Sequence, residues 1–205
     1  MHAEPTLPEP RTASIVRAGF ASDAASLALI HASLIDPSPR ARVLALRAGA
    51  RRDALSTSDW LRALGDADAE VRRDALVLLG ERDAIDDVLV AVRQALSDPE
   101  PLVVDAAAFA LGEHGDLASV DALCQVAAHE DARCREAAVA ALGSIGSERA
   151  LPTIIAALED KAPVRRRAVV ALANFEGDEV DQALARASED RDWQVRAAVE
   201  QLTRD

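Results

Sequence analysis

A ten-residue segment recurs six times at nearly constant spacing, and this repetition constrains the fold more than any other feature of the sequence. The clearest copies read VRRDALVLLG at 71–80, VVDAAAFALG at 103–112, CREAAVAALG at 134–143 and VRRRAVVALA at 164–173. Weaker copies begin at Ala41 and Val195, so the copies follow one another at steps of 30, 32, 31, 30 and 31 residues. A regular period of this length indicates a solenoid of stacked supersecondary units.

Each copy carries the pattern of an amphipathic helix. If its first residue is counted as offset 0, apolar residues occupy offsets 0, 3 or 4, 7 and 8. An acidic turn precedes the copy and is expected to cap the helix, and glycine at offset 9 in three copies can end it in a left-handed conformation. Another apolar helix precedes each turn, as at 84–96 and 151–158. The sequence therefore predicts an all-α, right-handed solenoid of about six helical hairpins with a period near 31 residues.

The pattern V-R-x-x-A-x-x-A-L-G after an acidic turn resembles the short HEAT-like repeats of bacteria, the type also found in phycobilin lyases. The signatures of tetratricopeptide and ankyrin repeats are missing. The resemblance covers about residues 22 to 205 and implies little about function, since such repeats recur in unrelated proteins. The predicted organisation is a disordered tail at 1–11 and a single repeat domain at 12–205, with repeats at about 22–52, 53–83, 84–115, 116–146, 147–177 and 178–205.

Charge and composition narrow the function classes. The formal net charge of −12 argues against a protein that grips nucleic acid or an anionic membrane. The first eleven residues contain no apolar core of a secretory signal, and no stretch has the length and apolarity of a membrane helix. Two cysteines are too few for a disulfide framework. A cytoplasmic location is the resulting expectation.

An arginine at offset 1 recurs from copy to copy. A row of this kind could bind phosphates, but an acidic turn lies at the same spacing. We therefore expect each guanidinium to pair with the acidic turn of its own or an adjacent repeat and to fix how the repeats dock. The members of this structural ladder are Arg42, Arg72, Arg135, Arg165 and Arg196.

Offsets 2 and 6 lie on the side of the helix opposite its buried face, at 100° per residue. In stacked repeats that side lines the concave surface, so a shallow apolar seam between mixed charges is expected there, with Glu113 flanking it at offset 10. A competing interpretation packs Phe109 and Val170 against neighbouring helices. The residues expected to contact a partner are Arg73, Val77, Asp105, Phe109, Glu113, Glu136, Arg166 and Val170.

Convergent groups for catalysis are not evident in the sequence. The four histidines do not repeat at metal-ligand spacing, and Cys134 replaces a valine found in other copies, so it is expected to be buried and inert. Deoxyhypusine hydroxylase, a HEAT-type enzyme, binds di-iron through His-Glu pairs at offsets 2 and 3, which no copy here carries. We expect no catalytic residues, no metal and no cofactor.

The favoured function is a non-catalytic scaffold or adaptor that binds a protein or peptide on the concave face. The acidic charge favours a basic partner. Two alternatives follow from the repeat class. Phycobilin lyase-like bilin handling uses the same repeat as a cradle, and the alkylpurine DNA glycosylases share the repeat class but need a cationic groove. The sequence names neither the partner nor the oligomeric state.

Overall fold

The computed structural model describes residues 9–83 and 86–204. Within these ranges every regular element is a helix and no strand occurs, which confirms the predicted all-α class. The chain divides into two compact units, Met1–Ala91 and Val92–Asp205, with the boundary inside helix α6 (Asp86–Gln94). Each unit is described by itself. The single repeat domain over 12–205 stays a prediction.

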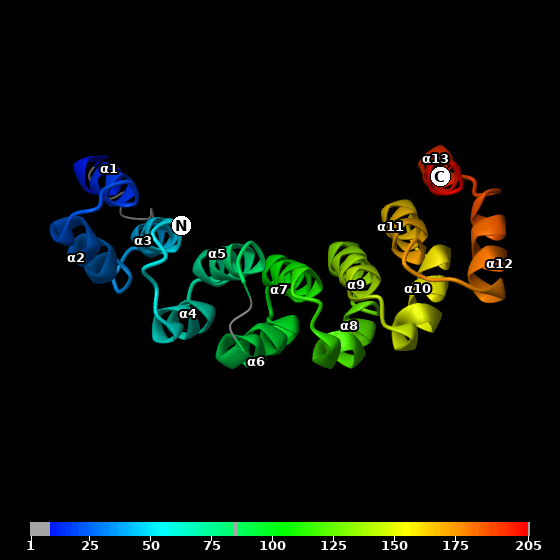
Figure 1. Cartoon of the computed structure of the whole chain (residues 1–205), viewed down its shortest axis with the longest axis horizontal. Helices are drawn as coiled ribbons and strands as arrows, with labels where there is room; N and C mark the ends of the chain where they lie inside the picture. Colours follow the sequence, from blue (N-terminus) through cyan, green and yellow to red (C-terminus); the bar gives the residue numbers. More distant parts are fainter. Residues whose placement is uncertain (1–8, 84–85, 205) are drawn as a thin grey trace. The chain divides into compact units, whose positions relative to one another are not determined.

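In the first unit, helices α1, α3 and α5 pack in succession, α2 packs on α1 and α3, and α4 packs on α5 (Figure 1). Each pair α2–α3 and α4–α5 is a hairpin whose second helix contains the repeated segment. The bounds are α1 Glu9–Ala18, α2 Ala24–Ser33, α3 Pro39–Arg51, α4 Thr57–Leu64 and α5 Ala69–Gly80.

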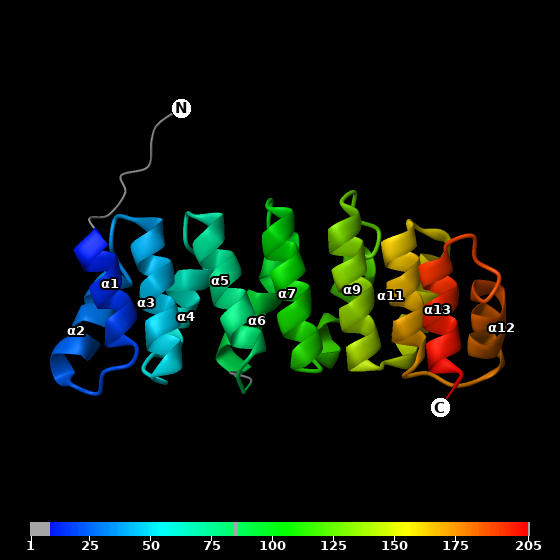
Figure 2. The same cartoon turned by 90° about the horizontal axis from the view of Figure 1, so that it is seen from above.

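The second unit repeats this arrangement. Helices α7, α9, α11 and α13 form one row, and α8, α10 and α12 form a second layer beside it (Figures 1 and 2). Short 3₁₀ turns precede or follow the first helix of several hairpins. The bounds are η1 Ala95–Ser97, α7 Pro101–Glu113, η2 Leu117–Ser119, α8 Val120–Val126, α9 Ala132–Ile145, η3 Glu148–Ala150, α10 Leu151–Ala156, η4 Ala157–Glu159, α11 Ala162–Leu172, α12 Asp178–Ala187 and α13 Trp193–Leu202.

The core follows the period of the sequence. Every copy buries its residues at offsets 0 and 4, which are small aliphatic side chains or, in one case, Cys134. Offset 5 is also buried wherever it carries a large aliphatic residue, as at Leu76 and Val169. Val169 belongs to a core cluster with Ala187, Val195 and Val199 of the following hairpin. Small side chains at offset 4 let adjacent second helices approach closely. The buried aromatic side chains are Trp60 and Phe175, which lie outside the repeated segments.

The offset-9 glycines do not end their helices in a left-handed conformation, contrary to the expectation from the sequence: Gly80 is the last residue of α5, but it is not among the glycines with positive φ. Gly112 and Gly143 lie inside α7 and α9, which continue to Glu113 and Ile145. The left-handed glycines come later: Gly146 is the C-terminal cap of α9, with φ of 65° and its N–H donated to the Leu142 carbonyl. Positive φ is therefore required three residues after offset 9.

Close packing explains the glycine at offset 9. A Cβ built on Gly112 would lie 2.9 Å from the Ala141 Cα, and one on Gly143 would lie 2.8 Å from the Ala171 Cα. Both distances are shorter than van der Waals contact, and the opposing atoms belong to the backbone. Offset 9 of one repeat thus packs on offset 7 of the next, which is alanine in both cases.

Helix α1 corrects the predicted tail. Residues 1–8 lie outside the described residues, but α1 begins at Glu9, inside the segment predicted to be disordered. One period before Ala41, this helix carries Arg11 at offset 1 and Gly19 at offset 9. A Cβ on Gly19 would lie 3.0 Å from the Ala48 Cα, which is the same contact that Gly112 makes. Helix α1 is therefore a further copy of the repeated second helix.

Candidate functional site

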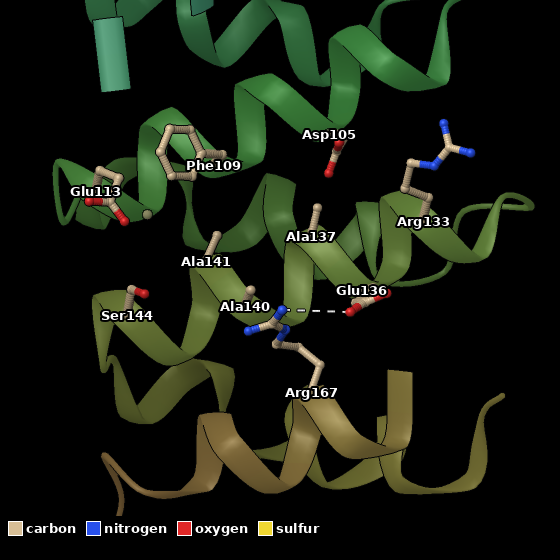
Figure 3. Close-up of a pocket in the computed structure, with 11 residues that line it drawn as sticks. Asp105, Phe109, Glu113, Arg133, Glu136, Ala137, Ala140, Ala141, Ser144 and Arg167 are labelled. Atoms are coloured by element: carbon tan, nitrogen blue, oxygen red, sulfur yellow. Dashed lines mark ion pairs between the residues drawn. The ribbon is translucent and has the colours of Figure 1, made fainter. Parts of the chain in front are cut away.

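A groove of about 450 Å³ lies between α7 and α9 in the second unit, with one residue of α11 at its edge (Figure 3). The two helices run side by side, so side chains from both point into the space between them. The groove is lined by Asp105, Phe109, Gly112, Glu113, Arg133, Glu136, Ala137, Ala140, Ala141, Ser144 and Arg167.

The groove exists because its floor is made of small residues. Gly112 on α7 and Ala137, Ala140 and Ala141 on α9 raise no side chain beyond a methyl group. Phe109 stands on one wall with 41% of its surface exposed, and Figure 3 shows its ring above this floor. An aromatic ring with this exposure beside an alanine floor offers an apolar surface that another side chain can cover.

Charged groups surround this apolar surface. Glu136 pairs with Arg167 of α11 at 3.6 Å, the distance between Oε1 and Nη2. Glu113 is exposed and has no ion-pair partner among the described residues. Asp105 and Arg133 line the end of the groove opposite Glu113 (Figure 3). With three carboxylates against two guanidiniums, the lining has an excess of one negative charge.

The structure brings together part of the predicted contact set. Its members in this groove are Asp105, Phe109, Glu113 and Glu136. Arg166 and Val170 are exposed on α11 but do not line the groove. Arg73 and Val77 lie on α5 in the first unit, where Val77 lines a separate hollow of about 440 Å³ with Arg47 and Arg51.

Some residues of the groove were not predicted from the sequence. They lie on the side of each second helix that faces the preceding repeat. Ala137, at offset 3, and Arg167, at the same offset of the next copy, both point toward the previous second helix. Arg133 and Ser144 stand at offsets −1 and 10 of α9. At 100° per residue these offsets lie at angles between about 260° and 300°, next to offset 6 at about 240°. The helical periodicity could therefore have predicted these residues.

The arginines at offset 1 form a regular set of hydrogen bonds within each unit. Arg135 donates from Nε and Nη2 to the two oxygens of Asp160 at 2.6 Å each, and Arg165 does the same to Asp190 at 2.8 and 2.7 Å. In both cases Nη1 donates to a carbonyl of the arginine's own turn. Each guanidinium thus joins two successive turns.

The first unit contains the same contact. Arg42 donates to both oxygens of Asp66 at 2.7 Å, and Arg11 of α1 bonds Asp36 at 2.5 Å. Arg72 donates to the Asp66 carbonyl oxygen, and in the second unit Arg196 of the last helix donates to the Asp190 carbonyl oxygen. Arg11 was missing from the predicted ladder, although a step of one period back from Arg42 leads to it.

In each of two acidic turns, one aspartate binds the arginine and a second aspartate caps the helix. Asp66 and Asp190 accept the arginine of the previous repeat and the backbone N–H two residues later. The helix caps are Asp68 and Asp192, whose side chains accept from the N–H groups of Glu70 and Gln194. The acidic turn therefore caps the helix as expected, but at these turns the cap is the second aspartate and the first one binds the arginine.

These hydrogen bonds shift the titration of the acids. The Arg135 guanidinium lowers the pKa of the Asp160 carboxyl, and Arg165 likewise lowers the pKa of Asp190, in both cases against an opposing effect of burial. The same bonds raise the pKa of both arginines. The Arg135–Asp160 and Arg165–Asp190 pairs are therefore charged at neutral pH.

Reactive groups are few in the part of the chain that the structure describes. No group of three or more His, Cys, Asp or Glu side chains there could hold a metal ion. The Cys134 thiol is buried and donates to the Pro101 carbonyl at 3.4 Å. Burial first, and then the charges of Asp131 and Asp105, raise the pKa of this thiol, so it is a weaker nucleophile than an ordinary cysteine at neutral pH.

Sequence-family comparison agrees with the geometry. The family model for HEAT repeats matches residues 57–143 and 120–203, which together cover most of the chain. The chain belongs to the HEAT-repeat family. The predicted resemblance is thereby confirmed. No curated protein matches the sequence of this HEAT-repeat protein.

Solved structures share the fold at low sequence identity. An engineered protein is 19% identical with a TM-score of 0.67, the match covering 86% of this chain and 96% of that one. The complex of CpcE and CpcF of phycocyanin lyase from Nostoc sp. PCC7120 is 22% identical with a TM-score of 0.64, covering 84% and 74%. A designed armadillo repeat protein in complex with the peptide (KR)4 is 16% identical with a TM-score of 0.59, covering 95% and 98%. These likenesses establish the solenoid fold of the HEAT-repeat protein.

The described helices of the HEAT-repeat protein include none with the length and apolarity needed to cross a membrane. The cytoplasmic location stays a prediction from the sequence.

Proposed function

We propose that this protein is a non-catalytic scaffold that holds a segment of a partner protein in the groove between α7 and α9. The observation that carries the proposal is Phe109, an aromatic ring 41% exposed above a floor of glycine and alanine. The surrounding helices are fixed by close packing at Gly112 and Ala141, so the groove is formed before a partner arrives. A preformed groove lowers the entropic cost of binding.

The chemistry of the groove supports binding rather than catalysis. Its polar groups are carboxylates, guanidiniums and the Ser144 hydroxyl, and it contains no histidine or cysteine to activate a nucleophile. Apolar contact with Phe109 would supply affinity, while the charged rim would orient the segment. HEAT-repeat and armadillo-type folds are suited to this task because they present long rows of parallel helices.

The test compares two substitutions on α7 that bury a charge to a similar degree. Phe109→Asp places the charge in the groove, whereas Leu102→Asp places it on a residue 46% exposed that does not line the groove. Tagged wild type and both variants would be used to capture partners from the native organism, followed by mass spectrometry. We expect a protein retained by wild type and Leu102→Asp and lost from Phe109→Asp. Equal capture by Phe109→Asp would contradict the proposal.

Folding must be verified first, because Phe109 is also partly packed. Circular dichroism and thermal melting of Phe109→Asp should match Leu102→Asp within a few degrees. A much larger loss for Phe109→Asp would favour the competing interpretation, in which Phe109 is a packing residue.

Bilin handling, the alternative suggested by the resemblance, is tested with the same proteins. Mixing wild type with a free bilin and recording the visible spectrum would show a shifted and intensified absorption band if a bilin is held. That result would replace the scaffold proposal.

A further inference from the structure

Glu113 continues the row that begins with Asp105 and Phe109. These residues are spaced by four positions on α7, so their side chains succeed one another at intervals of about 6 Å along one side of the helix. Phe109 therefore stands between two carboxylates, and all line the groove. Because Glu113 is exposed and lacks an ion-pair partner among the described residues, its charge is available to a ligand.

The length of the groove limits what fits. On α9 the lining runs from Arg133 to Ser144, twelve residues whose eleven rises span about 16 Å of helix. An extended peptide covers this distance with about five residues. In such a peptide, side chains on the same face are separated by two residues and about 6.6 Å. This spacing is close to that between Phe109 and Glu113.

The register then fixes the chemistry of the occupant. If a bulky apolar side chain covers the Phe109 ring above the alanine floor, the residue two positions along the peptide lies beside Glu113 and Ser144. A carboxylate and a hydroxyl oxygen both accept hydrogen bonds. An arginine meets both groups, because its planar fork donates several hydrogen bonds and matches the geometry of a carboxylate.

We propose that the occupant is an extended segment in which an arginine lies two residues from a bulky apolar residue, with the arginine bound at Glu113 and the apolar side chain on Phe109. This inference rests on the scaffold function proposed above and specifies its ligand. An acidic residue at the same position is disfavoured by Glu113 directly and by the negative charge of the lining.

The test begins with random dodecapeptides displayed on phage and selected on the full-length protein, with counter-selection on Phe109→Asp. We expect the retained peptides to share an arginine two residues from Leu, Ile, Met or Phe. A selected peptide would then be synthesised with arginine or with glutamate at that position. Binding of both forms would be measured by fluorescence polarisation.

A charge exchange at Glu113 makes the assay specific. We expect Glu113→Arg to bind the arginine peptide at least tenfold more weakly than wild type and to bind the glutamate peptide more tightly than wild type does. The control is Glu148→Arg, which changes the same charge on an exposed residue of η3 outside the groove and should leave both affinities unchanged.

The outcomes separate the two proposals. Peptides that depend on Phe109 but lack a shared arginine, or that are unaffected by Glu113→Arg, overturn the ligand assignment and leave the scaffold function standing. If no peptide shows dependence on Phe109, the groove itself is not a peptide site and both proposals fail.

Discussion

Replacing Gly143 by alanine adds one methyl group where α9 packs against α11. The added Cβ would lie 2.6 Å from the Ala171 Cβ and 2.8 Å from the Ala171 Cα, whereas carbon atoms in contact are separated by about 3.5–4.0 Å. A Cα cannot rotate away as a flexible side chain can. The two helices must therefore move apart by close to 1 Å, which loosens the contacts of the buried residues around them.

The expected loss of stability follows from two opposing effects. Overpacking of a core costs about 1–3 kcal/mol, while alanine is better than glycine inside a helix by up to about 1 kcal/mol. We therefore expect Gly143→Ala to lower the free energy of unfolding by about 1–2 kcal/mol and the melting temperature by about 2–8 °C. Urea denaturation followed by circular dichroism at 222 nm measures the first quantity, and a thermal scan measures the second.

Gly65→Ala provides the matched control. Gly65 caps α4 with φ of −96°, and a Cβ there would lie 3.5 Å from its nearest neighbour, the Leu61 carbonyl oxygen. We expect this variant to be as stable as wild type or more stable by up to about 1 kcal/mol. Adding Ala171→Gly to Gly143→Ala should cost less than the sum of the single changes. The packing argument is refuted if Gly143→Ala equals or exceeds wild type in stability.

Three further predictions concern the ladder and the buried thiol. Arg165→Ala should lower the free energy of unfolding by about 3 kcal/mol in urea denaturation, because Arg165 is only 5% exposed and Asp190 would lose its partner. The control Arg204→Ala removes an exposed pair and should change the free energy of unfolding by less than about 0.5 kcal/mol. Equal losses in the two variants would contradict the structural role of the ladder. The lowered pKa of Asp160 gives stability that is complete above its ordinary value of 3.8 and is lost as the pH falls through the folded value. The stability difference between wild type and Asp160→Asn should therefore shrink as the pH falls below 3.8, and a constant difference would refute this. Cys134 should resist a thiol reagent such as DTNB at pH 8 in the folded protein and react after unfolding in urea. The variant Cys134→Val distinguishes the signal of Cys134 from that of Cys124. Rapid labelling of Cys134 in the native protein would contradict its burial.

The repeat and its buried face could be predicted because both depend on local helical geometry. The apolar residues at offsets 0 and 4 lie on one side of a 100° rotation per residue whatever the neighbouring helix is. The pairing of Arg135 with Asp160 could be expected for a related reason, since both residues recur with the period of the chain. The row of Asp105, Phe109 and Glu113 was likewise visible as one side of a helix.

Other features depended on the distance between helices, which no single helix encodes. The offset-9 glycines have the same sequence signature as a left-handed helix end, and only the approach of Gly143 to Ala171 shows that close contact is what requires them. Helix α1 lacks the valine and leucine of the motif, so its membership became evident from the contacts of Arg11 and Gly19.

The sequence by itself determined the period, the class of repeat and which side of each second helix is buried, because side-chain direction along a helix is a local property. Tertiary structure decided which exposed side chains share a space. Arg167 pairs with Glu136 at the groove because α11 presents its offset 3 toward α9, whereas Arg166, one residue earlier, does not line it. A rotation of 100° between adjacent residues is enough to move a charge from the solvent to the site, and only the packing of successive repeats sets that direction.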